Sequence, residues 1–302
     1  MRTALIECVP NVSEGRDRGV IRELGDALEA AGTQLIDVHS DGDHHRSVFT
    51  YFGSTEVVER ATLALARAAV RLVDLTRHRG AHPRVGAIDV VPFVPLCGST
   101  MEGAVAAARR VGRAFAEETS VPVFFYGEAA TSADRRELPL VRRGGFEQLS
   151  ERMQSPEWRP DAGPLAPHPT AGATLVGVRT ALVAFNAVLE SDDVALAKAI
   201  AVAVRESSGG LPEVRAMGVL LASRRLVQVS MNLLSYRRTP VSVVAERIES
   251  EARRRGTKVL EYELVGCSPS DALDLWPSHL APIAGLKPSQ LLDPGLFPSG
   301  TS

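Results

Sequence analysis

The sequence predicts an α/β fold, an α+β sandwich of two ferredoxin-like βαββαβ subdomains. Strand-like and helix-like segments follow one another in the order βαββαβ, and the same order returns later in the chain. A stretch rich in proline and glycine separates the two runs. Because a single core rarely grows beyond about 250 to 300 residues, a chain of 302 residues favours two cores.

The first run is defined by apolar residues at helical spacing, such as Ile21, Leu24 and Leu28, and by short β-branched and aromatic segments. The turn-rich residues 40–43 predict a hairpin. The expected order is a strand at 3–9, a helix at 19–31, strands at 34–38 and 47–52, a helix at 55–72 and a strand at 88–96, then a helix at 101–118 and a strand at 121–127.

The second run follows a stretch at 155–173 whose five prolines exclude a sustained helix, so that this stretch is a linker or a binding loop. Beyond it we expect a strand at 180–189, a helix at 192–206, strands at 214–222 and 226–234, a helix at 241–255 and a strand at 258–265. The alternative is one continuous sheet with an inserted loop. The last 25 or so residues are expected to pack weakly.

The composition excludes several classes of protein. With 34 Lys and Arg against 36 Asp and Glu, the chain lacks the positive charge that nucleic-acid or membrane-surface binding requires. No apolar run approaches the roughly 18 residues of a membrane span. The N-terminus lacks the apolar core of a signal peptide, and the three isolated cysteines suggest reduced thiols. A cytoplasmic protein is therefore expected.

Residues 78–96 carry the most informative pattern, because their loop contains two histidines, two arginines and flexible glycines before a strand. Pro83 stiffens the chain directly after His82, which would fix the imidazole. A fixed histidine near a cleft suits general acid–base chemistry, since its ordinary pKa lies close to working pH. The alternative is a loop histidine without a role.

Five of the seven histidines lie in the first 82 residues. Their spacing matches no metal-binding template, and the adjacent His44 and His45 should point to opposite faces of a hairpin, so we expect no metal. Residues 161–172 form a rigid loop whose backbone amides could cap a flat heterocycle, although composition alone favours a linker.

These segments resemble the formiminotransferase domain of formiminotransferase-cyclodeaminases and their stand-alone bacterial relatives. The pattern HxGxHPRxGAxDVxPFxP at 78–95 is highly specific. Further matching stretches follow one order over about 260 residues: ECVPNVSEGR at 7–16, LID at 35–37, DHHRSVFTYFG at 43–53, PVFFYGEAA at 122–130, EWRPDAGP at 157–164, LVAFNAVL at 182–189, QVSMNLL at 228–234 and ELVG at 263–266.

The resemblance implies an N-terminal subdomain at 1–178, a C-terminal subdomain at 179–302, a folate tunnel between them and a homodimer. It implies transfer of a formimino group from N-formimino-L-glutamate to tetrahydrofolate in histidine degradation. His82 matches the catalytic histidine of the family. The segment matching the folate-binding loop consists of Gly163, Pro164, Leu165, Ala166, Pro167, His168, Pro169, Thr170, Ala171 and Gly172.

The resemblance also suggests further site residues. Asp37 or Asp43 would hold the cationic formimino group, and Arg46 and Arg84 would pair with the substrate carboxylates.

His39 and His45 are further candidates for binding the amino-acid donor. They stand where animal members carry aspartate and asparagine, so the identity of that donor is left open. The alternatives are another formimino or formyl donor, a folate-binding protein without transferase activity, or a metal-dependent hydrolase. A separate cyclodeaminase would process the product.

Overall fold

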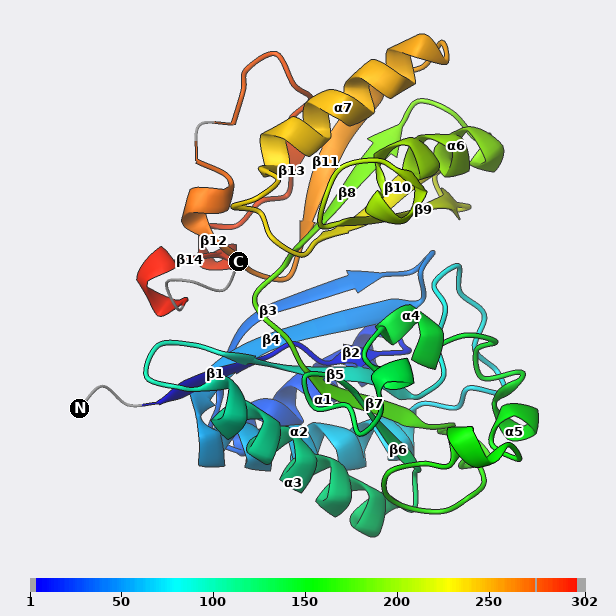
Figure 1. Ribbon diagram of the computed structural model, residues 1–302, viewed down its shortest axis with the longest axis vertical. Helices are drawn as coiled ribbons and strands as arrows, with labels where there is room; N and C mark the ends of the chain where they lie inside the picture. Colours follow the sequence, from blue (N-terminus) through cyan, green and yellow to red (C-terminus); the bar gives the residue numbers. More distant parts are fainter. Residues whose placement is uncertain (1–3, 275, 298–302) are drawn as a thin grey trace. The chain divides into compact units, whose positions relative to one another are not determined.

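The computed structural model describes residues 4–274 and 276–297. The chain divides into two compact units, residues 1–179 and 180–302. Each unit has its own sheet and its own apolar core, and Figure 1 shows the helices and strands of both.

The first unit contains a seven-stranded sheet. Within it, strands β3, β4, β1 and β5 are neighbours in that order and pair antiparallel, with two helices in the connections. The bounds are β1 Leu5–Cys8, β2 Asn11–Val12, α1 Arg18–Ala30, β3 Gln34–Asp41, β4 Arg46–Ser54, α2 Thr55–Leu72 and β5 Ile88–Pro95. This strand order is that of a ferredoxin-like βαββαβ unit.

Two parallel strands extend this sheet beyond β5. Helix α3 (Met101–Thr119) leads to β6 (Val123–Gly127), and β7 (Thr174–Val178) lies between β5 and β6. The sequence analysis missed β7, because its five residues follow directly on the proline-rich stretch. The linker interpretation of that stretch is therefore wrong. The stretch lies within the first unit, as do the short helices α4 (Leu138–Val141) and α5 (Leu149–Arg152) upstream of it.

The second unit repeats the same topology. Strands β11, β8, β10 and β9 are antiparallel neighbours in that order, and β13 adds a parallel pairing to β11. The bounds are β8 Val183–Leu189, α6 Val194–Val204, β9 Val214–Leu221, β10 Leu226–Leu233, α7 Val241–Arg254, β11 Val259–Val265 and β13 Ile283–Ala284. The duplicated ferredoxin-like prediction is confirmed, and the single-sheet alternative is wrong.

The first helix of each unit begins in the same way. Asp17 caps α1 by accepting hydrogen bonds from the amides of Gly19 and Val20, and Asp193 caps α6 by accepting from Ala195. A carboxylate at this position satisfies free amides of the first helical turn. The repeated cap agrees with a duplicated supersecondary unit.

The C-terminal segment differs from its prediction. Leu280 packs into the core of the second unit, and Leu292 and Phe297 are buried. Strands β12 (Ser268–Pro269) and β14 (Leu291–Leu292) pair with each other. The apolar residues between the prolines supply this packing, so the expectation of weak packing is wrong up to residue 297, beyond which the residues lie outside the described part.

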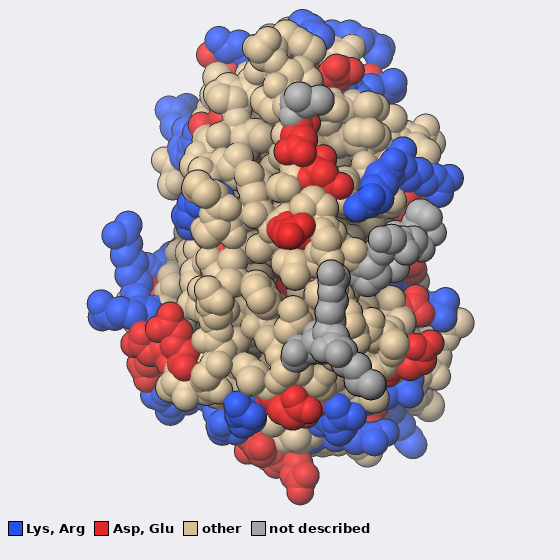
Figure 2. Space-filling view, turned by 90° about the vertical axis from the view of Figure 1, so that its left-hand side faces the viewer, with Lys and Arg blue, Asp and Glu red and all other residues tan. Residues whose placement is uncertain are grey.

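On the face drawn in Figure 2, basic and acidic side chains are interspersed around a broad area of other residues. This distribution agrees with the net charge of −2. Across the part of the chain that the structure describes, helices lack the combination of length and apolar composition that a bilayer span needs.

Candidate active site

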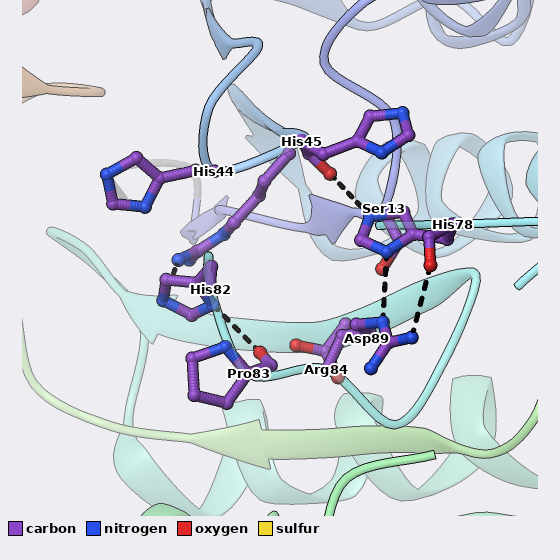
Figure 3. Close-up of a pocket in the computed structure, with 9 residues that line it drawn as sticks. Ser13, His44, His45, His78, His82, Pro83, Arg84 and Asp89 are labelled. Atoms are coloured by element: carbon purple, nitrogen blue, oxygen red, sulfur yellow. Dashed lines mark hydrogen bonds between the residues drawn. The ribbon is translucent and has the colours of Figure 1, made fainter. Parts of the chain in front are cut away.

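The loop that carries His82 lies at one end of the first sheet. Strands β4 and β5 begin at this end and β3 finishes there, because β1 pairs antiparallel with both β4 and β5. The hairpin turn at residues 42–45 and the connection at residues 73–87 therefore meet. Nine residues from these segments and their neighbours line a small pocket (Figure 3): Ser13, His44, His45, Arg46, His78, His82, Pro83, Arg84 and Asp89.

Two hydrogen bonds fix the His82 imidazole. Its Nδ1–H donates to the Pro83 carbonyl at 2.8 Å, since a carbonyl oxygen can only accept. The lone pair is consequently on Nε2, which accepts a hydrogen bond from Arg46 Nη1. The predicted stiffness of the His–Pro step thus acts through the proline carbonyl, which selects the tautomer.

The surroundings of His82 favour the neutral ring. Burial first, and then the nearby guanidinium groups of Arg46 and Arg142, hold the pKa of His82 well below its ordinary value. His44 lies close by, with ring centroids 5.8 Å apart. A neutral histidine whose Nε2 carries the lone pair can accept a proton at neutral pH, which is what a general base requires.

His45 and His78 clamp the loop onto the hairpin. Their rings stack with centroids 4.2 Å apart, and His78 donates from Nε2 to the His45 carbonyl at 2.7 Å. His78 Nδ1 accepts from Arg84 Nε at 3.0 Å, and burial lowers the pKa of His78 to about 4. Gly80 is required here, because a Cβ would stand 2.3 Å from the His44 carbonyl oxygen.

Three guanidinium groups surround the pocket, and carboxylates compensate two of them. Arg84 forms two hydrogen bonds with Glu147, at 2.7 and 3.0 Å. Arg142 pairs at 2.7 Å with Asp89, whose side chain is buried. Arg46 contacts His82, and its buried Nε has no hydrogen-bond partner within the described residues. Arg46 is thus the guanidinium most suited to bind an anion.

Of the other predicted residues, Asp43 and His45 belong to the hairpin turn beside the pocket, whereas Asp37 and His39 lie outside its lining. Asp43 joins the hairpin to the His82 loop through its carbonyl, which accepts from the Ala81 amide at 3.0 Å. Asp37 and His39 lie on β3, opposite Thr50 and Val48 of β4, and are not among the residues that line the pocket. His45 pairs with Glu14 at 3.2 Å and stacks on His78, so His45 is part of the clamp.

The second half of the segment from Gly163 to Gly172 contacts the end of the His82 loop at Val85 and Ala87, although none of its residues is among those that line the pocket. The amide of Gly172 donates to the His168 carbonyl, and the amide of Ala87 donates to the Ala171 carbonyl, both at 2.9 Å. Gly172 has a φ of +68°, and a Cβ there would lie 2.1 Å from the Val85 carbonyl oxygen. Gly163, at the other end, lies beside Ala116 and Val121.

Sequence reasoning missed Asp89, Arg142 and Glu14 as parts of the site. Asp89 accepts hydrogen bonds from the Val85 amide at 2.8 Å and from Arg142, so it fixes the end of the loop. The signal was present, since Asp89 lies within the specific 78–95 motif. Arg142 comes from a segment without periodicity, which sequence patterns could not connect to the loop. Within residues 4–274 and 276–297, no group of His, Cys, Asp or Glu has a metal-binding arrangement.

Comparison with known families identifies both units. Residues 5–179 match the formiminotransferase domain, N-terminal subdomain, and residues 184–278 match the formiminotransferase domain. The chain belongs to the formiminotransferase family. The resemblance predicted from the 78–95 motif is thereby confirmed.

Relatives in this family include single-activity and bifunctional proteins. The chain is 40% identical to glutamate formimidoyltransferase of Streptococcus pyogenes serotype M1 over 270 residues, which are 89% of this chain and 90% of that protein. It is 41% identical to the protein of the same name from Thermoplasma acidophilum over 273 residues, with the same coverage. It is 43% identical to formimidoyltransferase-cyclodeaminase of Sus scrofa over 276 residues, but covers only 51% of that protein.

Proposed function

We propose that this protein is a glutamate formimidoyltransferase, which transfers the formimino group from N-formimino-L-glutamate to tetrahydrofolate and yields 5-formimino-tetrahydrofolate and glutamate. The observation that carries the proposal is the neutral His82 with its Nε2 lone pair beside Arg46. The names of the bacterial relatives support the same activity.

The proton balance of this reaction assigns His82 its role. A ring nitrogen of tetrahydrofolate attacks the formimino carbon, becomes cationic and must lose a proton, while the departing glutamate nitrogen must gain one as its bond to that carbon breaks. His82 Nε2 takes the first proton and returns it to the leaving nitrogen. The Pro83 carbonyl holds Nδ1–H throughout, so the ring keeps one orientation.

Arg46 is proposed to bind a carboxylate of the amino-acid donor. Its guanidinium suits a carboxylate, and it lacks the acidic partner that Arg84 and Arg142 have. The pocket as it stands encloses about 10 Å³, which is roughly the room for one water. Arg46 would therefore leave His82 when the donor binds, which exposes Nε2 to the reacting atoms. Arg84 then contributes mainly by holding His78.

The remaining assignments complete the proposal. The segment from Gly163 to Gly172 would bind folate, and Asp37 or Asp43 would stabilise the cationic formimino group. Asp89 is a further candidate for that role, since it is a carboxylate that lines the pocket. His39 would contribute to substrate binding. The free cysteines are consistent with the expected cytoplasmic location. We place the activity in histidine degradation, with a separate cyclodeaminase acting on the product.

A spectrophotometric transfer assay with purified protein, N-formimino-L-glutamate and tetrahydrofolate tests the proposal. We expect turnover with this pair, unaffected by a chelator, and slower turnover with formimino-glycine. The melting temperature should also rise with tetrahydrofolate, because a ligand of the native state stabilises it. A rise in melting temperature without transfer would favour the folate-binding alternative, and faster transfer from another donor would correct the substrate.

A further inference from the structure

Asn11 is a buried side chain of the first unit that the reaction described above does not use. It belongs to the ECVPNVSEGR stretch at 7–16, and only 6% of the residue is exposed. Its Oδ1 has no hydrogen-bond partner within the described residues. A buried acceptor without a donor costs free energy, so such an atom calls for a physical reason. A ligand that donates a hydrogen bond to Oδ1 would supply that reason.

The backbone of Val9 determines which atom of the Asn11 amide is left without a partner. Asn11 Nδ2 donates to the Val9 carbonyl at 2.8 Å. A carbonyl oxygen can only accept, so the amide cannot turn its own oxygen toward Val9 and keep this bond. Oδ1 therefore faces away from Val9, and at this place the protein presents an acceptor and not a donor.

Asn11 lies on the same face of the first sheet as Arg46. Helices α1, α2 and α3 cover the other face, and Val12, Phe49 and Tyr51 belong to the apolar core that these helices form with the sheet (Figure 1). Successive side chains of a strand point to opposite faces, so Asn11 and Arg46 both point away from the helices.

Asn11 is also adjacent to the pocket of the candidate active site. It pairs with Val48 of β4, so Arg46, two residues before Val48, is its diagonal neighbour at about 7 to 8 Å. On its other side it pairs with Val90 of β5, which follows Asp89. Arg46 and Asp89 line the pocket, whereas Asn11 lies next to this lining. A substrate that displaces Arg46 would therefore come within reach of Asn11.

We propose that Asn11 Oδ1 accepts a hydrogen bond from the terminal nitrogen of the formimino group and so selects a formimino donor over a formyl donor. The terminal atom of a formimino group is a nitrogen that carries hydrogen, whereas that of a formyl group is an oxygen, which can only accept. With a formyl donor two acceptors would face each other in a buried place, which a site built for an N–H group rejects. The inference rests on the proposed function and names the group by which that site recognises its substrate.

Thr50 is the other diagonal neighbour of Asn11, two residues after Val48. Its buried hydroxyl also lacks a hydrogen-bond partner within the part of the chain that the structure describes. A hydroxyl can rotate to donate or to accept, so it would serve a formimino and a formyl group equally. The fixed amide of Asn11, and not this hydroxyl, is therefore the group that can discriminate.

Isothermal titration calorimetry of the full chain with N-formimino-L-glutamate and with N-formyl-L-glutamate tests the inference. Without folate no transfer can occur, so the titrations measure binding alone. The wild-type chain should bind the formimino compound more tightly by about tenfold to a hundredfold, the range for a hydrogen bond to a charged group. Asn11→Leu should reduce this preference about tenfold, because leucine has a similar size and no acceptor. A wild-type chain without the preference, or an unchanged preference in Asn11→Leu, would overturn the inference.

Asn11→Asp is the second variant, and it keeps an acceptor oxygen at this position. It should retain the preference for the formimino compound, and its loss there would also contradict the role of Oδ1. Asn232→Leu is the matched control, since Asn232 is an exposed asparagine on β10 of the second unit, and both dissociation constants should stay unchanged. Thermal melts show that each variant is folded.

The transfer assay separates this inference from the proposed function. A wild-type chain that binds the formimino compound with the expected preference, loses this preference in Asn11→Leu and transfers nothing to tetrahydrofolate would overturn the proposed function alone. A chain that transfers the formimino group while Asn11→Leu keeps the full preference would overturn the role of Asn11 alone.

Discussion

Residues 73–87 connect α2 to β5 in the first unit, whereas residues 255–258 make the corresponding connection from α7 to β11 in the second. The preceding hairpins, by contrast, are alike. Each turn has four residues, and the last of them has a left-handed backbone, with a φ of +52° at His45 and +51° at Arg225. The two units thus share the ferredoxin-like βαββαβ frame, and this connection is one of the places where they differ.

That difference shows how a repeated frame acquires a site. The longer connection in the first unit carries His78 and His82 and folds back onto the hairpin, where His45 and Arg46 meet it. The corresponding connection of the second unit has four residues, 255–258, and carries no histidine. The candidate site therefore depends on the longer connection, because the second unit has the same arrangement of strands and helices without it.

Removal of His82 is the most severe way to test this comparison. His82→Ala should reduce turnover by about a hundredfold to ten-thousandfold, the usual contribution of a general acid–base group. Folding should change little, because the His82 ring is only half-buried. Steady-state kinetics and thermal melts measure the two effects. His279→Ala in the second unit is the control. Because His279 is exposed, this substitution should leave turnover unchanged. Near wild-type turnover in His82→Ala would move the proton transfer elsewhere.

Arg46→Gln should separate substrate binding from proton transfer. Losing the guanidinium should raise KM for the formimino donor by about tenfold to a hundredfold, the range for a charge-assisted pair. It should also shift the acid limb of the pH profile upward. His82 must be neutral to accept a proton, so activity falls as the pH drops through its pKa, and Arg46 is one of the groups that hold this pKa low.

Kinetics from pH 4 to 8 would measure that shift, a range that brackets the ordinary histidine pKa of about 6.5. Arg84→Gln is the matched variant. Because Arg84 already pairs with Glu147, its substitution should raise KM less than Arg46→Gln does. An acid limb that stays in place in Arg46→Gln would contradict the assigned contact between Arg46 and His82.

His78→Ala should affect stability more than chemistry. The substitution removes the stack on His45 and leaves Arg84 Nε without its acceptor, which should cost about 1 to 3 kcal/mol. The unfolded chain has the ordinary histidine pKa of 6.5 and the folded one about 4, so the unfolded state binds more protons between these values. Wild-type stability should therefore decrease as pH falls from 6.5 to 4, and the variant should lose that component.

Urea unfolding at pH 7 and pH 5 measures this effect, since the first value lies above the ordinary histidine pKa and the second below it. Turnover should fall much less in His78→Ala than in His82→Ala. An unchanged pH dependence of stability would show that His78 titrates normally in the folded state.

Much of this organisation could be predicted from the sequence. The 3.6-residue spacing of Ile21, Leu24 and Leu28 and the repeated βαββαβ order were sufficient for the duplicated fold. The motif around His82 was sufficient to predict the loop that meets the hairpin, and the catalytic role of His82 stays a prediction. The pairing of Arg142 with Asp89, 53 residues apart, was not predictable, because an ion pair between a strand and a distant irregular segment leaves no periodic trace. Strand β7 was hidden for a similar reason, since five residues after a proline-rich stretch carry little pattern.

The shared turn allows the smallest and most controlled test of the comparison. Arg225 is at a left-handed position, its side chain is 86% exposed, and its only ion pair within the described residues is a 3.5 Å contact with Asp192. Arg225→Gly should raise the free energy of unfolding by about 0.5 to 1 kcal/mol, because glycine adopts this backbone without strain.

The same relief of backbone strain is available at His45. There, however, glycine also removes the stack on His78 and the bond to Glu14, so His45→Gly should lower stability. Chemical denaturation of both variants at pH 7, where an ordinary histidine is mostly uncharged, gives the sign of the change in the free energy of unfolding for each. If both glycine variants were stabilising, His45 would contribute no more to its turn than Arg225 does, and it would not clamp the loop that carries His82.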